Sequence, residues 1–90
     1  MARYKTKPCE IEAIQWMGDN LEEIIRFAKS SLIWNTIYNG LGQLLGYEIS
    51  IETLKGTMLV SKGDYIIRGL SGEFYPCREE VFKRNYEVIK

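Results

Sequence analysis

The chain has 90 residues, of which 46% are hydrophobic and 27% charged. This composition is typical of one globular domain over residues 1–90 and excludes a disordered chain. Twelve basic and twelve acidic side chains give a net charge of zero, which argues against a protein held on nucleic acid by phosphate neutralisation.

Histidine is absent, and the cysteines are Cys9 and Cys77. The usual zinc sites need more Cys and His ligands than this, so we expect neither a metal nor a cofactor. A bridge between the cysteines, if formed, would join the first predicted strand to a late one.

The amino end carries the local excess of basic charge. Arg3, Lys5 and Lys7 are soon opposed by Glu10 and Glu12, so we expect a solvated tip with no function of its own. This end lacks the apolar segment and cleavage site of a signal peptide, so we expect a cytosolic protein with reduced thiols.

The first predicted strand runs from Pro8 to Trp16, where β-branched and aromatic residues alternate loosely. Ile14 and Trp16 fall on one face. The other face holds Cys9, Ile11 and Ala13. We therefore expect a strand that is buried on both sides toward its end.

A helix is predicted next, ending near Ser30. Asp19 and Glu22 have the spacing of a capping box at its start. Its apolar positions follow the i, i+3, i+4, i+7 pattern of a face that packs on a sheet: Leu21, Ile24, Ile25 and Ala28.

Between Lys29 and Glu48 the sequence has no charged residue. Glycines and polar residues interrupt the stretch, which argues against a membrane span and favours a strand from Leu32 to Tyr38 with a glycine-rich turn. Two interpretations stay open: a hairpin buried in the protein's own core, or an interface with a subunit or ligand. The interface would use Trp34, Ile37, Tyr38, Leu41 and Leu44.

The second half predicts further short elements. Strands are expected at Tyr47–Thr53, Thr57–Val60 and Tyr65–Arg68, with Pro76 marking an edge or strand end. A short helix from Arg78 to Asn85, with Val81 and Phe82 inward, precedes a closing strand at Tyr86–Ile89. The predicted fold is α+β: a small, mainly antiparallel β-meander with an N-terminal helix packed on the sheet and a short C-terminal helix.

The side chains favour binding over catalysis. The lack of histidine removes the commonest general base, and the carboxylates are scattered at the spacing of solvated strand faces. A minor alternative is an enzyme that uses Cys77 or a carboxylate pair. The ligand-binding candidates combine anion donors with aromatic faces: Trp16, Lys62, Arg68, Tyr75 and Arg78.

Several segments carry a family resemblance: Lys5-Thr6-Lys7-Pro8, Ile11-Glu12-Ala13-Ile14-Gln15-Trp16, Gly63-Asp64-Tyr65-Ile66-Ile67-Arg68-Gly69 and Gly72-Glu73-Phe74-Tyr75-Pro76-Cys77. Through them the chain resembles a family of short, largely uncharacterised bacteriophage and prophage proteins. The resemblance covers roughly residues 4–29 and 47–87 and leaves out the uncharged middle. Two departures are Lys62, at a turn position that is proline in the family, and Arg78-Glu79-Glu80, which replaces Lys-Pro-Asp.

The resemblance implies a phage origin and a place in the host bacterial cytoplasm. Our first hypothesis is a homo-oligomer that counteracts host defence by sequestering a small anionic or nucleotide-like ligand. In it Trp16, Arg68, Tyr75 and Arg78 line the pocket, and the uncharged stretch joins subunits. The alternatives are an anti-CRISPR-like inhibitor that binds a host defence or regulatory protein through Trp34 and Tyr38, and a virion or assembly component. We expect no direct nucleic-acid binding.

Overall fold

The computed structural model describes the backbone of residues 2–6 and 9–88 and the side chains of residues 11–86. The fold is α+β, with antiparallel strands, an N-terminal helix and a short C-terminal helix, as the sequence predicted. In chain order its elements are β1 (Ala2–Thr6), β2 (Cys9–Gln15), α1 (Leu21–Ala28), the 3-10 turn η1 (Lys29–Ser31), β3 (Leu32–Tyr38), β4 (Leu44–Thr53), β5 (Gly56–Val60), β6 (Tyr65–Arg68), β7 (Phe74–Cys77), α2 (Glu79–Asn85) and β8 (Glu87–Val88).

The described strands divide between two antiparallel sheets, ordered β7-β6-β2-β1-β8 and β3-β4-β5. The three-stranded sheet ends at β5, because β6 pairs with β2 and β7 and not with the preceding strand β5. Two backbone hydrogen bonds start this pairing: Trp16 N–H donates to the Asp64 carbonyl over 2.8 Å, and Gly63 N–H donates to the Trp16 carbonyl over 2.7 Å.

The core lies on both sides of β2 and β6. On one side Ile14 and Ile66 pack with α1 and the three-stranded sheet. On the other side Ala13 and Ile67 belong to a second cluster with Phe82 of α2. The prediction that the strand ending at Trp16 is buried on both faces is therefore confirmed.

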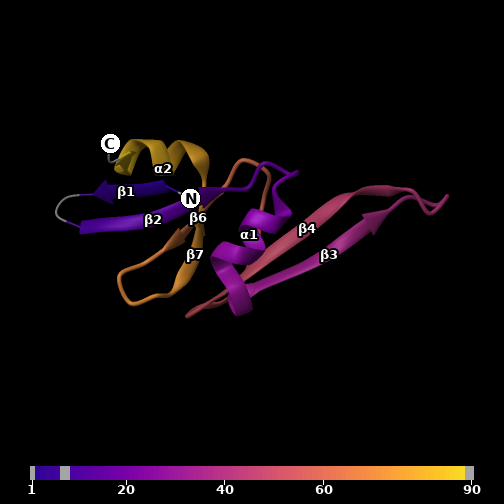
Figure 1. Ribbon diagram of the computed structural model, residues 1–90, viewed down its shortest axis with the longest axis horizontal. Coiled ribbons are helices and arrows are strands. Elements are labelled where there is room, and N and C mark those ends of the chain that lie inside the picture. Colours follow the sequence, from indigo (N-terminus) through magenta and orange to yellow (C-terminus); the bar gives the residue numbers. More distant parts are fainter. Residues whose placement is uncertain (1, 7–8, 89–90) are drawn as a thin grey trace.

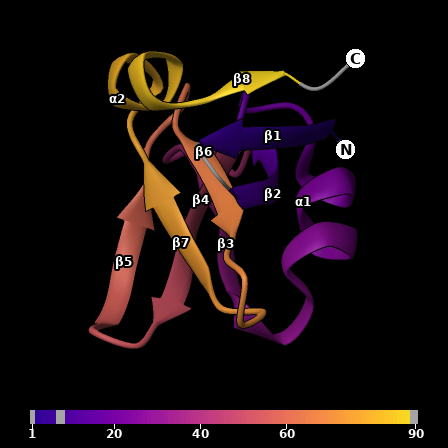
Figure 2. The ribbon, with the colours of Figure 1, turned by 90° about the vertical axis from the view of Figure 1, so that its left-hand side faces the viewer.

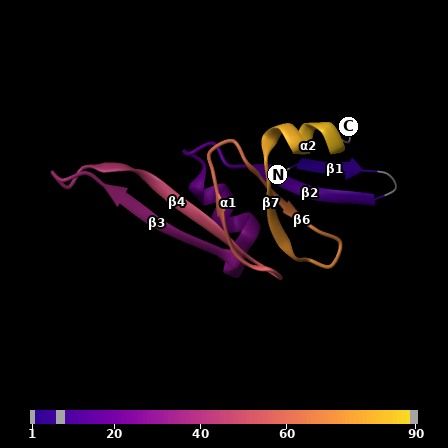
Figure 3. The same ribbon diagram turned by 180° about the vertical axis from the view of Figure 1, so that it is seen from behind.

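The β3–β4 hairpin extends beyond this core as an arm (Figures 1 and 3). It gives the molecule extents of 50 × 24 × 20 Å. The radius of gyration is 13.8 Å, whereas a compact chain of this length has roughly 12 Å. Much of the uncharged stretch therefore lies outside the core, which contradicts the interpretation of a hairpin buried within its own chain.

The start of α1 differs from the prediction. Its N-cap is Asn20, with no side-chain cap, so the Asp19–Glu22 capping box is wrong. The Asn20 side chain instead accepts a hydrogen bond from Met17 N–H and donates one to the Gln15 carbonyl. These bonds hold the loop between β2 and α1, and the helix begins one residue later.

The faces of both helices are also partly corrected. In α1 the buried residues include Phe27, whereas Ile25 is exposed, because Phe27 packs edge-to-face on Phe74, with ring centroids 5.4 Å apart. In α2 Phe82 is buried as predicted, but Val81 is exposed. Phe82 stacks on Tyr65 with centroids 3.9 Å apart, and this contact sets the inward face.

The amino end forms the strand β1, which pairs with both β2 and β8; the side chains of its basic residues lie outside the described ones, so the expected solvation of this end stays a prediction. The predicted ends at Pro8 and Ile89, and Lys7, lie outside the described residues. Cys77 is a free thiol. It lies across the sheet from Tyr65 and Gln15, and Cys9 is about 20 Å from Gln15 along β2 at roughly 3.3 Å per residue. A bridge within one chain is excluded.

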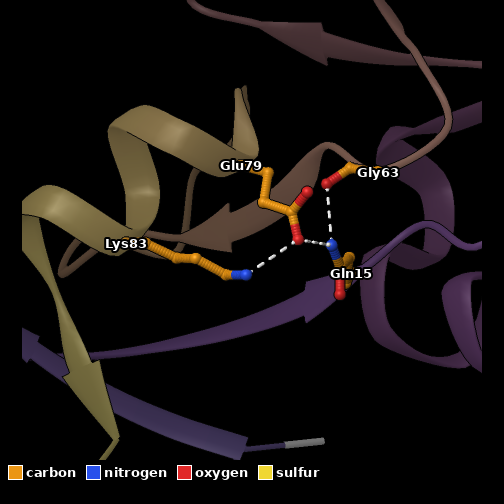
Figure 4. Close-up of polar contacts among 4 residues, drawn as sticks. All are labelled: Gln15, Gly63, Glu79 and Lys83. Carbon is orange, nitrogen blue, oxygen red and sulfur yellow. Dashed lines mark hydrogen bonds and ion pairs between the residues drawn. The ribbon is translucent and has the colours of Figure 1, made fainter.

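Polar contacts fix the start of α2 against the sheet (Figure 4). The Gln15 amide donates to the Glu79 carboxylate over 2.9 Å and to the Gly63 carbonyl over 3.0 Å. Lys83 lies 3.1 Å from the same carboxylate. The hydrogen bond from Gln15, followed by the contacts with Lys83, lowers the pKa of Glu79.

Candidate functional site, a pocket of cations and phenylalanines

A pocket of about 320 Å³ lies between the end of α1 and the turn that joins β6 to β7. Figure 2 shows these segments at the lower side of the molecule. We call it the cation–aromatic pocket, and it is lined by Arg26, Phe27, Lys29, Arg68, Gly72 and Phe74. Its lining contains three cations and no carboxylate. The volume is at the lower end of the range for small-ligand pockets.

The end of α1 supplies two of the cations. Arg26 is exposed in the last turn, and Lys29 follows directly after the helix. Among the described residues other than glycine, Lys29 alone has a positive φ, of 50° with ψ of −127°. This conformation is costly for a residue with a side chain. Strain of this kind often occurs at binding sites, where position matters more than stability.

Arg68 supplies the third cation from the end of β6. It lies opposite Glu12 of β2 in the sheet register, and its guanidinium donates to the Glu12 carboxylate over 2.8 Å. The carboxylate orients the guanidinium and neutralises part of the local charge. Within the part of the chain that the structure describes, neither Arg26 nor Lys29 forms an ion pair, so the pocket keeps an excess of positive charge.

Two phenylalanines form the apolar wall beside these cations. Phe27 and Phe74 meet edge-to-face, at an interplanar angle of 77°. Phe27 is buried and holds the wall in place, whereas Phe74 is partly exposed. A ring next to guanidinium and ammonium groups can contact a planar ligand while the cations bind its anionic part.

The sequence-predicted ligand residues do not meet in one cavity of the chain. Trp16 and Lys62 line a larger cavity of about 640 Å³ where the arm joins the body. Trp16 is only 3% exposed and cannot offer a stacking face. Asp19 and Glu48 in the same lining outnumber Lys62, so this cavity suits an anion poorly.

Tyr75 and Arg78 are also separated from the cation–aromatic pocket. Tyr75 lines a third cavity, of about 310 Å³, beside Leu54 and Met58. Burial, followed by a hydrogen bond to Tyr86, raises the pKa of Tyr75 to about 12. Arg78 is the exposed N-cap of α2. Of the predicted ligand residues, the structure thus brings Arg68 alone into the pocket.

The predicted interface residues all lie on the arm. Their exposed fractions range from 42% to 86%: Trp34, Ile37, Tyr38, Leu41 and Leu44. Only Ile37 of these also lines the large cavity at the base of the arm. Trp34 contacts Tyr47 edge-to-face, with centroids 6.2 Å apart, so the ring is held in position while nearly half of it faces solvent.

Sequence reasoning missed Arg26, Lys29, Phe27 and Gly72. None of these four residues was among the predicted ligand contacts. The available signal was local: Arg26 and Lys29 are spaced i, i+3 around Phe27 and therefore share one side of the helix end. The contribution of Gly72 has no local signal, because its turn meets α1 only through the β2–β6 pairing.

No group of three or more possible metal ligands occurs in the part of the chain that the structure describes. Burial, with a smaller contribution from Asp64, raises the pKa of the Cys77 thiol, so this thiol is protonated at neutral pH and is a weak nucleophile.

No helix within residues 2–6 and 9–88 is long and apolar enough to cross a bilayer. The cations and rings that line the cation–aromatic pocket are groups that can bind an anion. Comparison of the chain with protein-family models, with curated proteins and with solved structures gives no match.

Proposed function

We propose that the protein is a non-enzymatic binder that captures a small anionic, nucleotide-type ligand in the cation–aromatic pocket. The observation that carries this proposal is the lining itself, where three cations and two phenylalanines occur without a carboxylate. Arg26, Lys29 and Arg68 would hold a phosphate group, and Phe74 would contact the base. Capture without turnover agrees with the protonated Cys77 thiol.

Size and charge support a mononucleotide over a longer nucleic acid. The pocket holds about 320 Å³, and the whole chain has no net charge with which to follow a phosphate backbone. The resemblance to phage proteins supplies the proposed setting. In the host cytoplasm, a binder present in excess would withdraw a nucleotide signal from a defence system.

Three probes distinguish binding by the cations from binding by the aromatic wall: adenosine monophosphate, adenosine and inorganic phosphate. The monophosphate should stabilise the protein more than either fragment, because it alone engages both cations and ring. At a ligand concentration of 100 times Kd the expected stabilisation is about 2.7 kcal/mol, or a Tm rise of roughly 10 °C or more for a domain of this size. Added salt should weaken binding.

The matched variants are Arg26→Gln in the pocket and Arg84→Gln on the exposed side of α2. Loss of one charge-assisted hydrogen bond, worth about 1.5–3 kcal/mol, should weaken affinity roughly 10- to 100-fold. Arg84→Gln, and Arg78→Gln likewise, should leave the affinity unchanged. Titration calorimetry measures the difference, and chromatography of the recovered nucleotide should show that it is intact.

Two outcomes would remove the proposal. One is the absence of any stabilisation by the monophosphate. The other is an equal affinity of the Arg26→Gln and Arg84→Gln variants, which would place the ligand elsewhere on the surface.

A further inference from the structure

The outer edge of the arm is the strand β3. It stands at one end of the order β3-β4-β5, so its only strand partner among the described residues is β4. All of its residues after Leu32 are exposed. An edge strand of this kind presents unpaired backbone N–H and C=O groups to any strand of matching length.

The usual protections of an edge strand are missing from β3. Its sequence, LIWNTIY, has no lysine, no proline and no charged side chain, and its register shift lies only at the last step, between Ile37 and Tyr38. The opposite edge, β5, is shorter and lies close to β7. β3 is therefore the edge that is open for pairing.

The arm also exposes enough apolar surface for an interface. Seven large side chains on β3, β4 and the tip are 39% to 86% exposed: Ile33, Trp34, Ile37, Tyr38, Leu41, Leu44 and Leu45. At roughly 200 Å² for each large side chain, they leave on the order of 800 Å² in contact with water. This total is spread over both faces of the hairpin and its tip, and it is comparable to the area that each partner buries in an interface of standard size.

The tip of the arm is held in one conformation before any partner binds. The Asn39 side chain accepts hydrogen bonds from Leu41 N–H over 2.8 Å and from Gln43 N–H over 3.0 Å. It also donates to the Gln43 side chain over 2.8 Å. A hairpin that is ordered in advance loses less conformational entropy on association.

We propose that β3 pairs with β3 of a second copy of this chain, antiparallel across a two-fold axis at Asn35. The two three-stranded sheets then join into one of six strands. This register pairs the whole length of β3. It places Ile33 opposite Ile37 of the second copy, and Asn35 opposite its own counterpart, on one face of the sheet.

The chemistry of β3 favours a second copy over a different protein. Antiparallel pairing about a two-fold axis brings each residue to a residue of the same strand, so a charged strand would risk like charges in contact. β3 has none. The chain's net charge of zero also removes long-range repulsion between copies.

The test uses charges that the proposed register would bring together. Ile33→Glu and Ile37→Lys are single variants at exposed positions, and the double variant carries both changes. In the pairing proposed here each single change places a charge against isoleucine, whereas the double variant forms two Glu–Lys pairs across the strands. Leu70→Lys, on an exposed leucine in the β6–β7 turn, is the control for an added charge outside the arm.

Light scattering after gel filtration should give twice the 10.5 kDa chain mass for the wild type, the Leu70→Lys variant and the double variant. Each single variant should give the mass of one chain, or at least a tenfold higher dimer Kd, with an unchanged circular dichroism spectrum. A monomeric wild type overturns the proposal, even if it captures another protein through the arm. A dimer that survives both single changes, or a monomeric double variant, overturns the pairing and its register.

None of the arm residues lines the cation–aromatic pocket. Failure of this test therefore leaves the proposed ligand binding intact, and failure of ligand binding leaves the pairing intact.

Discussion

Replacement of Lys29 by glycine should make the protein more stable and at the same time weaken its binding of anions. Lys29 combines a φ of 50° with a ψ of −127°, a conformation dominated by glycine in turns. It also contributes its ammonium group to the cation–aromatic pocket. The two roles call for different residues at this position.

The magnitude follows from the backbone angles. A residue with a side chain in this sparsely populated region costs about 1–3 kcal/mol, which glycine would recover. The substitution also lowers the free energy of unfolding by about 0.5–1 kcal/mol, because glycine makes the unfolded chain more flexible. The net gain in the free energy of unfolding is on the order of 1 kcal/mol, or about 4–8 °C in Tm for a domain of this size.

Lys29→Ala is the control, because it removes the ammonium group but retains the strained backbone. Urea and thermal unfolding of both variants should show that Lys29→Gly alone is more stable than the wild type. Calorimetry with adenosine monophosphate should show that both variants bind more weakly. If Lys29→Gly were no more stable than Lys29→Ala, the backbone at this position would not be strained, and the argument that function selects lysine there would fail.

Three further predictions concern stability. Phe82→Ala should cost about 3–5 kcal/mol in urea unfolding, because the ring is 2% exposed and stacks on Tyr65 and Tyr86; a loss below about 1 kcal/mol would refute this packing. Burial and the hydrogen bond to Tyr86 raise the pKa of Tyr75 from 10.0 to about 12, so its stabilising contribution is complete below pH 10 and is lost as the pH rises through about 12. The difference in the free energy of unfolding between the wild type and Tyr75→Phe should therefore shrink over that pH range. The hydrogen bond from Gln15 is the main cause of the lowered pKa of Glu79, so the stabilisation by this carboxylate is present above the ordinary carboxyl pKa and is lost as the pH falls. Glu79→Gln should therefore make the free energy of unfolding less dependent on pH in the acid range, and an unchanged dependence would contradict the contacts of Figure 4.

Alternation and turn chemistry predicted much of the secondary structure. β3 has the predicted bounds, Leu32 to Tyr38. The strand predicted at Tyr47–Thr53 lies within β4, where Ile49 and Ile51 are buried two residues apart on one face. These patterns are local, because a strand with one buried face must alternate with period two. The sequence analysis did not predict β1. Its five residues are too few to show an apolar face, and its backbone pairs with β2 and β8.

The candidate site could not be predicted in the same way, because two segments about forty residues apart form it. Arg26 and Lys29 end α1, while Arg68 and Phe74 flank the β6–β7 turn. Their approach depends on β6 pairing with β2, a long-range choice that no pattern in either segment encodes. The predicted ligand residues were chosen by residue type along the chain, and the fold distributes them over different cavities.

The uncharged stretch shows what composition can and cannot decide. A long segment without charged residues indicates burial, either in the core of its own chain or in a contact between chains. The deciding quantity is how much core the rest of the chain already fills. Here β2, β4, β5, β6 and both helices complete two buried clusters, to which β3 adds only the partly buried Leu32. The remaining apolar side chains of β3 and the tip are left to solvent on a hairpin held rigid by Asn39. A monomer with such an exposed apolar surface is prone to aggregation. An uncharged edge strand of this kind is best covered by a strand of the same length that also lacks charge. The β3 strand of a second copy has both properties.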